Sequence, residues 1–304
     1  MWQIIGAGAI GCLWAANLKR IGQPVHLVTR IPSLTDTLKY QDLHNDMHHY
    51  KIIHSTSINS ISPLLICVKA TQVENVIATH INAINAEQPI ILMHNGMGCA
   101  ERVQALLPNN PIICATTANA ALLHAPLSVQ QTGQGMTYLG PFNNLARPYE
   151  ALAEPLNSAL GNTYWCDQIK HKLWLKILIN MAINPLTAIY QINNGQLLKG
   201  QLQKQIKAVA KEGVKLAVAE QVSLTEDELL NRIKQVITQT AQNYSSMNRD
   251  IHFQRTTENE HIAGYLLKKG MQHHITLPTI QSLYSKIKLL ENYNVGESLN
   301  NCAR

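Results

Sequence analysis

The chain has 304 residues, of which 46% are hydrophobic, and its formal net charge at pH 7 is +6. That length exceeds the size at which a single hydrophobic core usually keeps growing, so we expect two domains. The cations are dispersed and only 2 residues are Phe, which argues against a nucleic-acid surface and suits anionic small molecules better.

The N-terminus carries a glycine motif between a short strand and a helix. Residues 2–5 are apolar except for Gln3, and Gly6, Gly8 and Gly11 follow in the spacing G-x-G-x-x-G, before an Ala/Leu-rich run that Gly22 can terminate. Such glycines allow a tight turn, a close approach to a pyrophosphate and close helix packing. Three glycines alone could be an incidental turn, but this context favours dinucleotide binding by Gly6, Ala7, Gly8, Ala9, Ile10 and Gly11.

Arg30 follows the second strand, residues 25–29, roughly 20 positions beyond the glycines. An acidic residue at this position would bind a ribose 2′-hydroxyl, whereas a guanidinium can form a forked contact with a 2′-phosphate. We therefore expect NADPH to be preferred over NADH. The alternative is that Arg30 is an ordinary solvated loop cation.

Residues 42–54 contain four histidines, His44, His48, His49 and His54, in a polar stretch. We interpret it as a surface connection or edge strand and expect no metal site. No C-x-x-C pair, signal peptide or uninterrupted apolar run of roughly 18 residues is present, so we expect a cytoplasmic protein without a membrane partner. Six scattered cysteines are expected to be reduced, buried thiols: Cys12, Cys67, Cys99, Cys114, Cys166 and Cys302.

Apolar strand-like runs alternate with helical ones through the first half of the chain. Such runs predict a parallel sheet covered on both faces, with strands at 64–68, 90–93 and 112–114 and a helix at 73–84. A hairpin of residues 127–129 and 136–139 is expected around Gly133 and Gly135.

From Gln168 onward the pattern is helical. Amphipathic stretches lie near 200–221, 225–244, 247–271 and 278–292. Ser223 with Glu226 resembles a capping box, and Thr276 with Pro278 marks another helix start. The predicted fold is α/β, an N-terminal Rossmann-type doubly wound sheet (residues 1–167) followed by an all-helical C-terminal domain (residues 168–304).

Residues 173–185 are apolar except for Lys176, Asn180 and Asn184, which are spaced i, i+4, i+8 and so share one helix face. Burying these groups is costly unless an anionic, oxygen-rich ligand satisfies them. Pro185 is expected to place Asn184 at a helix end that projects into a cavity. Equally, Lys176 could reach solvent while both amides bind neighbouring helices.

Several motifs together resemble the ketopantoate reductase (2-dehydropantoate 2-reductase) family, in the family's order from residue 1 to about 267. They are the glycine turn, Arg30, the segments 68–73 and 94–98, the run Lys176-x3-Asn180-x3-Asn184-Pro185, and the run Ser245-Ser246-Met247-x2-Asp250-x4-Arg255-x-Thr257-Glu258.

The resemblance implies NADPH-dependent reduction of 2-dehydropantoate to (R)-pantoate in the pantothenate branch leading to coenzyme A, with the active site between the two domains. It implies that Lys176 is the general acid and that Glu258 fixes the substrate and nearby polar groups. Implied substrate-binding residues are Asn95, Asn180, Asn184, Asn194, Asn243 and Ser246; implied cofactor-binding residues are Arg30, Lys69, Asn95 and Glu258 beside the glycine turn. The implied partner is a small 2-keto acid, bound by a monomer or homodimer.

Three positions, Asn259, Glu260 and Ala263, depart from the family's usual pattern and concern helix packing behind Glu258. Without the resemblance, Glu258 would be interpreted as a solvated helix carboxylate. The alternatives are a related NADPH-dependent 2-keto acid reductase, another dehydrogenase of this architecture acting on a hydroxyacid or polyol phosphate, and a non-enzymatic NADPH-binding regulator. The presence of Lys176 argues against the regulator.

Overall fold

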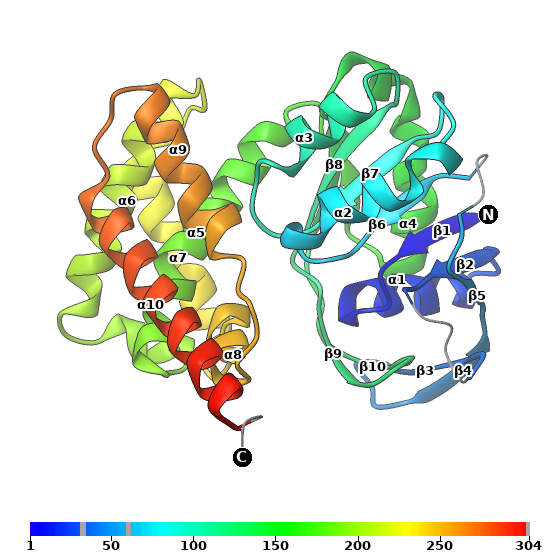
Figure 1. Cartoon of the computed structure of the whole chain (residues 1–304), viewed down its shortest axis with the longest axis horizontal. Helices are drawn as coiled ribbons and strands as arrows, with labels where there is room; N and C mark the ends of the chain where they lie inside the picture. The colour runs from blue at the N-terminus through cyan, green and yellow to red at the C-terminus, as the bar shows by residue number, and fades with distance from the viewer. Residues whose placement is uncertain (31–34, 59–61, 302–304) are drawn as a thin grey trace. The chain divides into compact units, whose positions relative to one another are not determined.

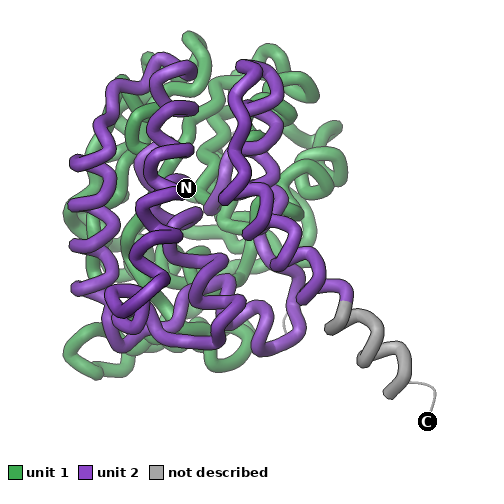
Figure 2. Tube along the Cα trace, turned by 90° about the vertical axis from the view of Figure 1, so that its left-hand side faces the viewer, with its two compact units in different colours: residues 1–94, 98–172 green, residues 95–97, 173–304 purple. Residues whose placement is uncertain are grey.

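A computed structural model describes residues 1–30, 35–58 and 62–301. The chain divides into two compact units (Figure 2): unit 1 contains residues 1–94 and 98–172, and unit 2 contains residues 95–97 and 173 to the C-terminus. The short segment 95–97 therefore belongs to the helical unit, although the chain on both sides of it belongs to the sheet unit.

Unit 1 is built on an eight-stranded sheet in the order β12-β11-β8-β7-β6-β1-β2-β5 (Figure 1). The strands from β8 to β5 in this order run parallel, and β11 is antiparallel to β8. The strand bounds are β1 Trp2–Ile5, β2 Val25–Val28, β5 Ile53–Ser55, β6 Leu64–Ile66, β7 Ile90–Met93, β8 Ile112–Thr117, β11 Thr137–Pro141 and β12 Thr163–Trp165. The central strands β6 and β7 are buried, continuous apolar runs, which are typical of a parallel sheet covered on both faces. The predicted fold class is confirmed.

Helices α1 and α4 pack together, as do α2 and α3. Their bounds are α1 Ala9–Arg20, α2 Ala70–His80, α3 Cys99–Leu106 and α4 Ala153–Leu160, with short helical turns at η1 Ile81–Ala83 and η2 Asn144–Leu152. α1 begins at Ala9, inside the glycine motif, and ends before Gly22, so the predicted helix is confirmed with an earlier start.

A second, four-stranded sheet in the order β4-β3-β10-β9 covers part of α1. Its bounds are β3 Thr37–Gln41, β4 Met47–Lys51, β9 Ala120–Ala125 and β10 Ser128–Gly133. The edge strand expected within residues 42–54 is present as β4.

The predicted hairpin of 127–129 with 136–139 is wrong. β10 pairs with β9, whereas β11 pairs with β8 in the other sheet. The Ala118 N–H donates to the Met136 carbonyl at 2.9 Å, and the Gly135 N–H donates to Asn119 Oδ1 at 3.1 Å. These contacts direct the chain away from β10 and into the large sheet, so the glycines mark a crossing between sheets.

Unit 2 is all-helical around one hydrophobic core. Its elements are η3 Asn194–Leu198, α6 Leu202–Ala219, α7 Glu226–Gln239, α8 Ser246–His252, the π-helical turn η4 Glu260–Gly264, α9 Tyr265–Gln272 and α10 Pro278–Asn301, together with most of α5 Ile169–Tyr190. The expected single stretch 247–271 is therefore broken by a non-helical segment after α8.

The two predicted helix starts have different outcomes. The N-cap of α7 is Thr225, whose side chain accepts from Glu228 N at 3.2 Å, so the Ser223–Glu226 box is wrong by two residues. α10 begins at Pro278 as predicted, and the Glu212 carboxylate accepts from the N–H groups of Thr279 and Ile280 at 2.8 and 3.0 Å.

α5 runs without a break through Pro185, so the prediction that Pro185 ends a helix at Asn184 is wrong. Leu186 and Ala188, beyond the proline, are fully buried in the core, and this packing outweighs the lost backbone hydrogen bond. By length and hydropathy α5 could cross a membrane. Trp174, Leu178 and other fully buried residues on α5 instead account for its apolar character.

The described cysteines are free thiols. Cys12, Cys99 and Cys114 are buried, and Cys67 and Cys166 are half-buried. Burial raises the pKa of Cys12 to about 12 and raises the pKa of Cys67 and Cys114 above the usual range, so these thiols resist ionisation. Cys302 lies outside the described residues.

Candidate active site

Each glycine of the N-terminal turn meets a different steric requirement. Gly6 has φ +108°, and a Cβ there would lie 2.8 Å from Val68. A Cβ on Gly11 would collide with the carbonyl oxygen of Gly6, whereas a Cβ on Gly8 would meet nothing within 4 Å. Gly8 is the N-cap of α1, whose first turn carries no acidic residue. This turn fits the pyrophosphate of a dinucleotide, since open space lies at the positive end of a helix dipole.

Two cations follow strands that flank β1 in the sheet. Arg30 is exposed just after β2, and Lys69 is half-buried at the N-cap of α2, after β6. The carboxyl ends of neighbouring parallel strands meet at one sheet edge, where nucleotides bind in this architecture. The predicted cofactor residues of unit 1 therefore share one edge of the sheet.

Lys176 is the central residue of the candidate site in unit 2. Burial lowers its pKa to about 8, although the nearby Glu258 carboxylate acts to raise that pKa. Asn180 is half-buried and Asn184 is buried, one and two turns further along α5. The helix therefore presents an ammonium and two amides along one face, as the sequence spacing predicted.

Glu258 is buried after α8 and accepts a hydrogen bond at Oε2 from Asn95 Nδ2 at 3.1 Å. The segment 95–97 reaches this position by docking on η4. The Met97 N–H donates to the His261 carbonyl at 2.9 Å, and a Cβ on Gly96, which has φ +80°, would lie 2.6 Å from the same oxygen. The structure thus brings Asn95, Glu258 and Lys176 together.

Three further predicted residues, Asn194, Asn243 and Ser246, lie in η3 and around the start of α8. Asn194 is buried, donates from its amide to Thr240 Oγ1 at 2.8 Å, and its backbone N–H donates to the Asn243 carbonyl at 2.9 Å. The side chains of Asn243 and Ser246 are exposed. These contacts give Asn194 a structural part in joining η3 to the chain before α8.

The family-like run after residue 245 contains mostly structural contacts. Ser245, rather than Ser246, caps α8, and its hydroxyl lies 2.7 Å from Thr187 Oγ1 on α5. Arg255 pairs with Asp250 at 3.4 Å. Sequence reasoning missed the part played by His261, because its contact with Gly96 joins distant positions and leaves no local pattern.

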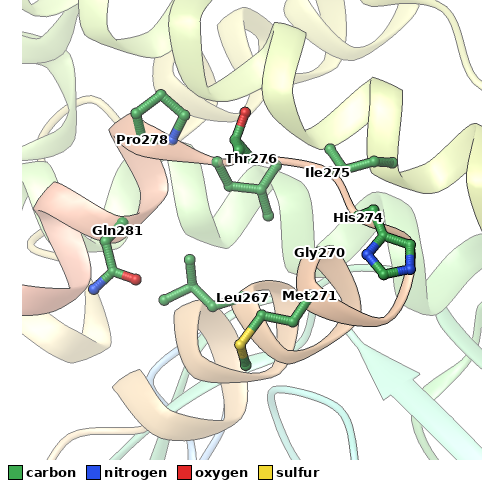
Figure 3. Close-up of a pocket in the computed structure, with 9 residues that line it drawn as sticks. Leu267, Gly270, Met271, His274, Ile275, Thr276, Pro278 and Gln281 are labelled. Carbon is green, nitrogen blue, oxygen red and sulfur yellow. The ribbon is translucent and has the colours of Figure 1, made fainter.

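No group of three or more His, Cys, Asp or Glu side chains suited to a metal ion occurs among the described residues. A pocket of about 570 Å³ lies between α9 and the start of α10 (Figure 3). Its lining is mostly apolar, with Leu267, Met271 and Leu277 around the single titratable group His274. None of the predicted site residues lines this pocket, so it is separate from the polar residues on α5.

The glycine turn on a Rossmann-type sheet, followed by a helical unit with a buried lysine and carboxylate, defines a dinucleotide-dependent class of oxidoreductases. Residues 2–144 match the family profile described as Ketopantoate reductase PanE/ApbA, and residues 168–291 match the profile of its C-terminal part. The chain belongs to the ketopantoate reductase family.

Individual relatives agree with the family. The 2-dehydropantoate 2-reductase of Vibrio cholerae is 37% identical over 95% of this chain and 97% of its own length. The 2-dehydropantoate 2-reductase of Salmonella typhimurium is 30% identical over 95% of this chain and 94% of its own length.

Solved structures share the fold. A probable 2-dehydropantoate 2-reductase from Bacillus subtilis has 27% identity and a TM-score of 0.81, covering 95% of this chain and 99% of its own. A D-mandelate dehydrogenase with NADH and anilino(oxo)acetate has 22% identity and a TM-score of 0.89, covering 97% of this chain and 99% of its own. The second likeness shows the fold alone.

Proposed function

We propose that the protein reduces 2-dehydropantoate to (R)-pantoate with NADPH, in the pantothenate branch leading to coenzyme A. The observation that carries this proposal is the buried arrangement of Lys176 and Glu258, with Asn95 hydrogen-bonded to that carboxylate. Family membership and the names of the relatives support the same substrate.

Lys176 is the general acid in this proposal. NADPH, when bound, would supply the hydride for the C2 carbonyl carbon. The ammonium of Lys176 then donates its proton to the carbonyl oxygen, so the oxygen becomes the C2 hydroxyl and the lysine becomes a neutral amine. Before transfer, the same ammonium stabilises the negative charge that develops on this oxygen.

The pKa of about 8 suits this task. An ordinary lysine titrates near 10.4 and holds its proton too firmly for efficient donation at neutral pH. Burial weakens that hold, whereas the negative charge of Glu258 opposes this effect and raises the pKa of Lys176. Asn95 orients the Glu258 carboxylate by donating to one of its oxygens.

The amides on α5 are proposed to bind the keto acid. Asn180 and Asn184 lie on the face of Lys176, and each offers N–H donors suited to a carboxylate or hydroxyl. Asn243 and Ser246 are proposed as further substrate contacts from the family resemblance. Asn194 is retained with them, although its amide already binds Thr240.

Cofactor choice is assigned to unit 1. Arg30 is exposed after β2 and offers a guanidinium for a 2′-phosphate, with Lys69 at the same edge of the sheet. We propose NADPH as the preferred cofactor on this ground. The positive end of α1 is proposed to hold the pyrophosphate at Gly8 and its neighbours.

The direct test follows NADPH absorbance with ketopantoate beside pyruvate and other small 2-keto acids, and repeats the series with NADH. We expect the highest kcat/KM with ketopantoate and NADPH. A higher value with another keto acid would assign the protein to a related reductase, because the fold alone does not fix the substrate. Binding of NADPH without oxidation by any keto acid would indicate a regulator.

A further inference from the structure

The residues 257–259, which contain Glu258, are buried and are fixed from α10. Thr257 donates twice to Glu291 Oε1, from its backbone N–H at 3.0 Å and from its hydroxyl at 2.7 Å. Asn259 Nδ2 donates to the backbone carbonyl of Tyr284 at 3.1 Å. The residue on each side of Glu258 is therefore bound to the same helix.

The two attachment points lie on one face of α10. Tyr284 and Glu291 are seven residues apart, which is two helical turns, or roughly 10 Å along the axis. The Thr257 hydroxyl also accepts from the Asn259 N–H at 3.0 Å. The residues on both sides of Glu258 are thus joined to each other and to α10 by hydrogen bonds, two of which are accepted by the Glu291 carboxylate.

Glu291 is itself held in place. Its side chain is 14% exposed, and its second oxygen lies 3.6 Å from Lys288 Nζ. Charge-assisted hydrogen bonds such as those accepted by Glu291 are stronger than neutral ones. An alanine at this position would leave two donors of a buried threonine unsatisfied.

We propose that Glu291 is a positioning residue for catalysis, which fixes the 257–259 segment and thereby places the Glu258 carboxylate beside Asn95 and Lys176. The inference rests on the proposed reductase function. It accounts for the family-like Thr257-Glu258 pair: the threonine fixes the backbone that presents the glutamate. The departures at Asn259 and Glu260 belong to the same packing, since Tyr284 also donates to Glu260 at 2.8 Å.

Loosening this segment has two consequences. The carboxylate of Glu258 would lose its fixed distance from Lys176, and misplacement by about 1 Å can cost on the order of 100-fold in rate. Glu258 would also support the protonated lysine less well, so the pKa of Lys176 would fall. Cofactor binding by unit 1 would be unchanged.

The test compares Glu291→Ala, Glu291→Gln and Thr257→Val with the control Glu212→Ala. Glu212, on α6, likewise accepts two hydrogen bonds in unit 2, from the backbone N–H groups of Thr279 and Ile280 at the start of α10. Ile280 is about 16 Å along α10 from Glu291. We expect Glu291→Ala to lower kcat by about 10- to 100-fold and to move the alkaline limb of the rate profile to lower pH.

Glu291→Gln keeps an acceptor oxygen and should restore kcat to within about threefold of the wild type. Thr257→Val should change kcat and the pH limb in the same direction as Glu291→Ala but by less. It replaces Glu291→Ala in the test if that variant does not fold. Glu212→Ala should lower the melting temperature without moving the pH limb. A pH limb and kcat of Glu291→Ala equal to those of Glu212→Ala, or a Glu291→Gln as impaired as the alanine, would overturn the proposal.

An NMR titration of the Lys176 side chain in the same variants separates this inference from the proposed function. If the wild type proves inactive with ketopantoate but the Lys176 pKa still falls in Glu291→Ala, the positioning role stands and the substrate assignment fails. If the wild type is active and the Lys176 pKa is the same in Glu291→Ala, the positioning role fails alone.

Discussion

Asn95 and Glu258 lie 163 positions apart in the chain, and the amide of the first donates to the carboxylate of the second at 3.1 Å. Asn95 follows directly after the end of β7, two residues beyond Met93. The hydrogen bond therefore lies inside the helical unit, to which residues 95–97 belong. Gly96 makes this contact possible, because its missing side chain lets the chain approach His261.

Gly96→Ala should disrupt the Asn95–Glu258 contact. The residue has φ +80°, which costs alanine about 1–2 kcal/mol, and the added Cβ would also collide with the His261 carbonyl. We expect kcat to fall at least tenfold, measured by NADPH oxidation. Gly22→Ala is the matched control: it has φ +79° but open space around its Cβ, so it should lower thermal stability and leave kcat unchanged. Equal kcat in both variants would contradict the contact's role.

Glu258→Gln should move the pH dependence of reduction to lower pH. If Lys176 donates the proton as proposed, kcat/KM is full below the lysine pKa of about 8 and is lost as the pH rises through it. The Glu258 charge raises this pKa, so its removal lowers the pKa and the limb shifts toward acid. Glu226→Gln, which removes an exposed carboxylate at the start of α7, should leave the limb in place. A shift of the Glu258→Gln limb toward alkali would show that the charge coupling is wrong.

Arg30→Ala should reduce the preference for NADPH. Loss of a guanidinium–phosphate contact is expected to raise the KM for NADPH by about 10- to 100-fold, since each tenfold corresponds to about 1.4 kcal/mol, while the KM for NADH changes little. Arg147→Ala removes an exposed arginine that contacts Asn144 in unit 1 and should preserve both values. An Arg30→Ala enzyme with wild-type cofactor preference would make Arg30 an ordinary surface cation.

Asn184→Ala should weaken binding of the keto acid. The buried amide is proposed to contact the substrate, and an unsatisfied hydrogen-bonding partner costs about 1–3 kcal/mol, which corresponds to a KM increase of about 5- to 150-fold. Asn248→Ala is the control, because that buried amide donates to the Thr187 carbonyl at 2.7 Å and is structural. Steady-state kinetics should show a raised KM for ketopantoate only in Asn184→Ala. The same increase in both variants would assign Asn184 a packing role.

Local patterns in the sequence were enough to predict the large sheet and the helical second half. The glycine turn, the buried strands and the shared helix face of Lys176, Asn180 and Asn184 each follow from residues that are close in the sequence, so local patterns predict them. Thr225 replaced Ser223 as the cap of α7 because both fit the same spacing rule, and the rule cannot choose between them.

Long-range contacts account for the errors. Leu186 and Ala188 are buried in the core, and this packing keeps α5 helical beyond Pro185 against local preference. The glycines at 133 and 135 resemble a hairpin, but the contact of Ala118 with Met136 makes them a crossing between two sheets. Glu291 gave no signal at all, because an acidic residue on an amphipathic helix is normally solvated.

The central claim is that Lys176 supplies the proton in the reduction of ketopantoate, and the most direct measurement is the turnover of Lys176→Ala with NADPH and saturating ketopantoate. We expect a loss of at least about 100-fold relative to the wild type, the usual scale for a positioned acid, with NADPH binding by unit 1 retained. Turnover within a few-fold of the wild type would contradict the assignment of Lys176 as the acid.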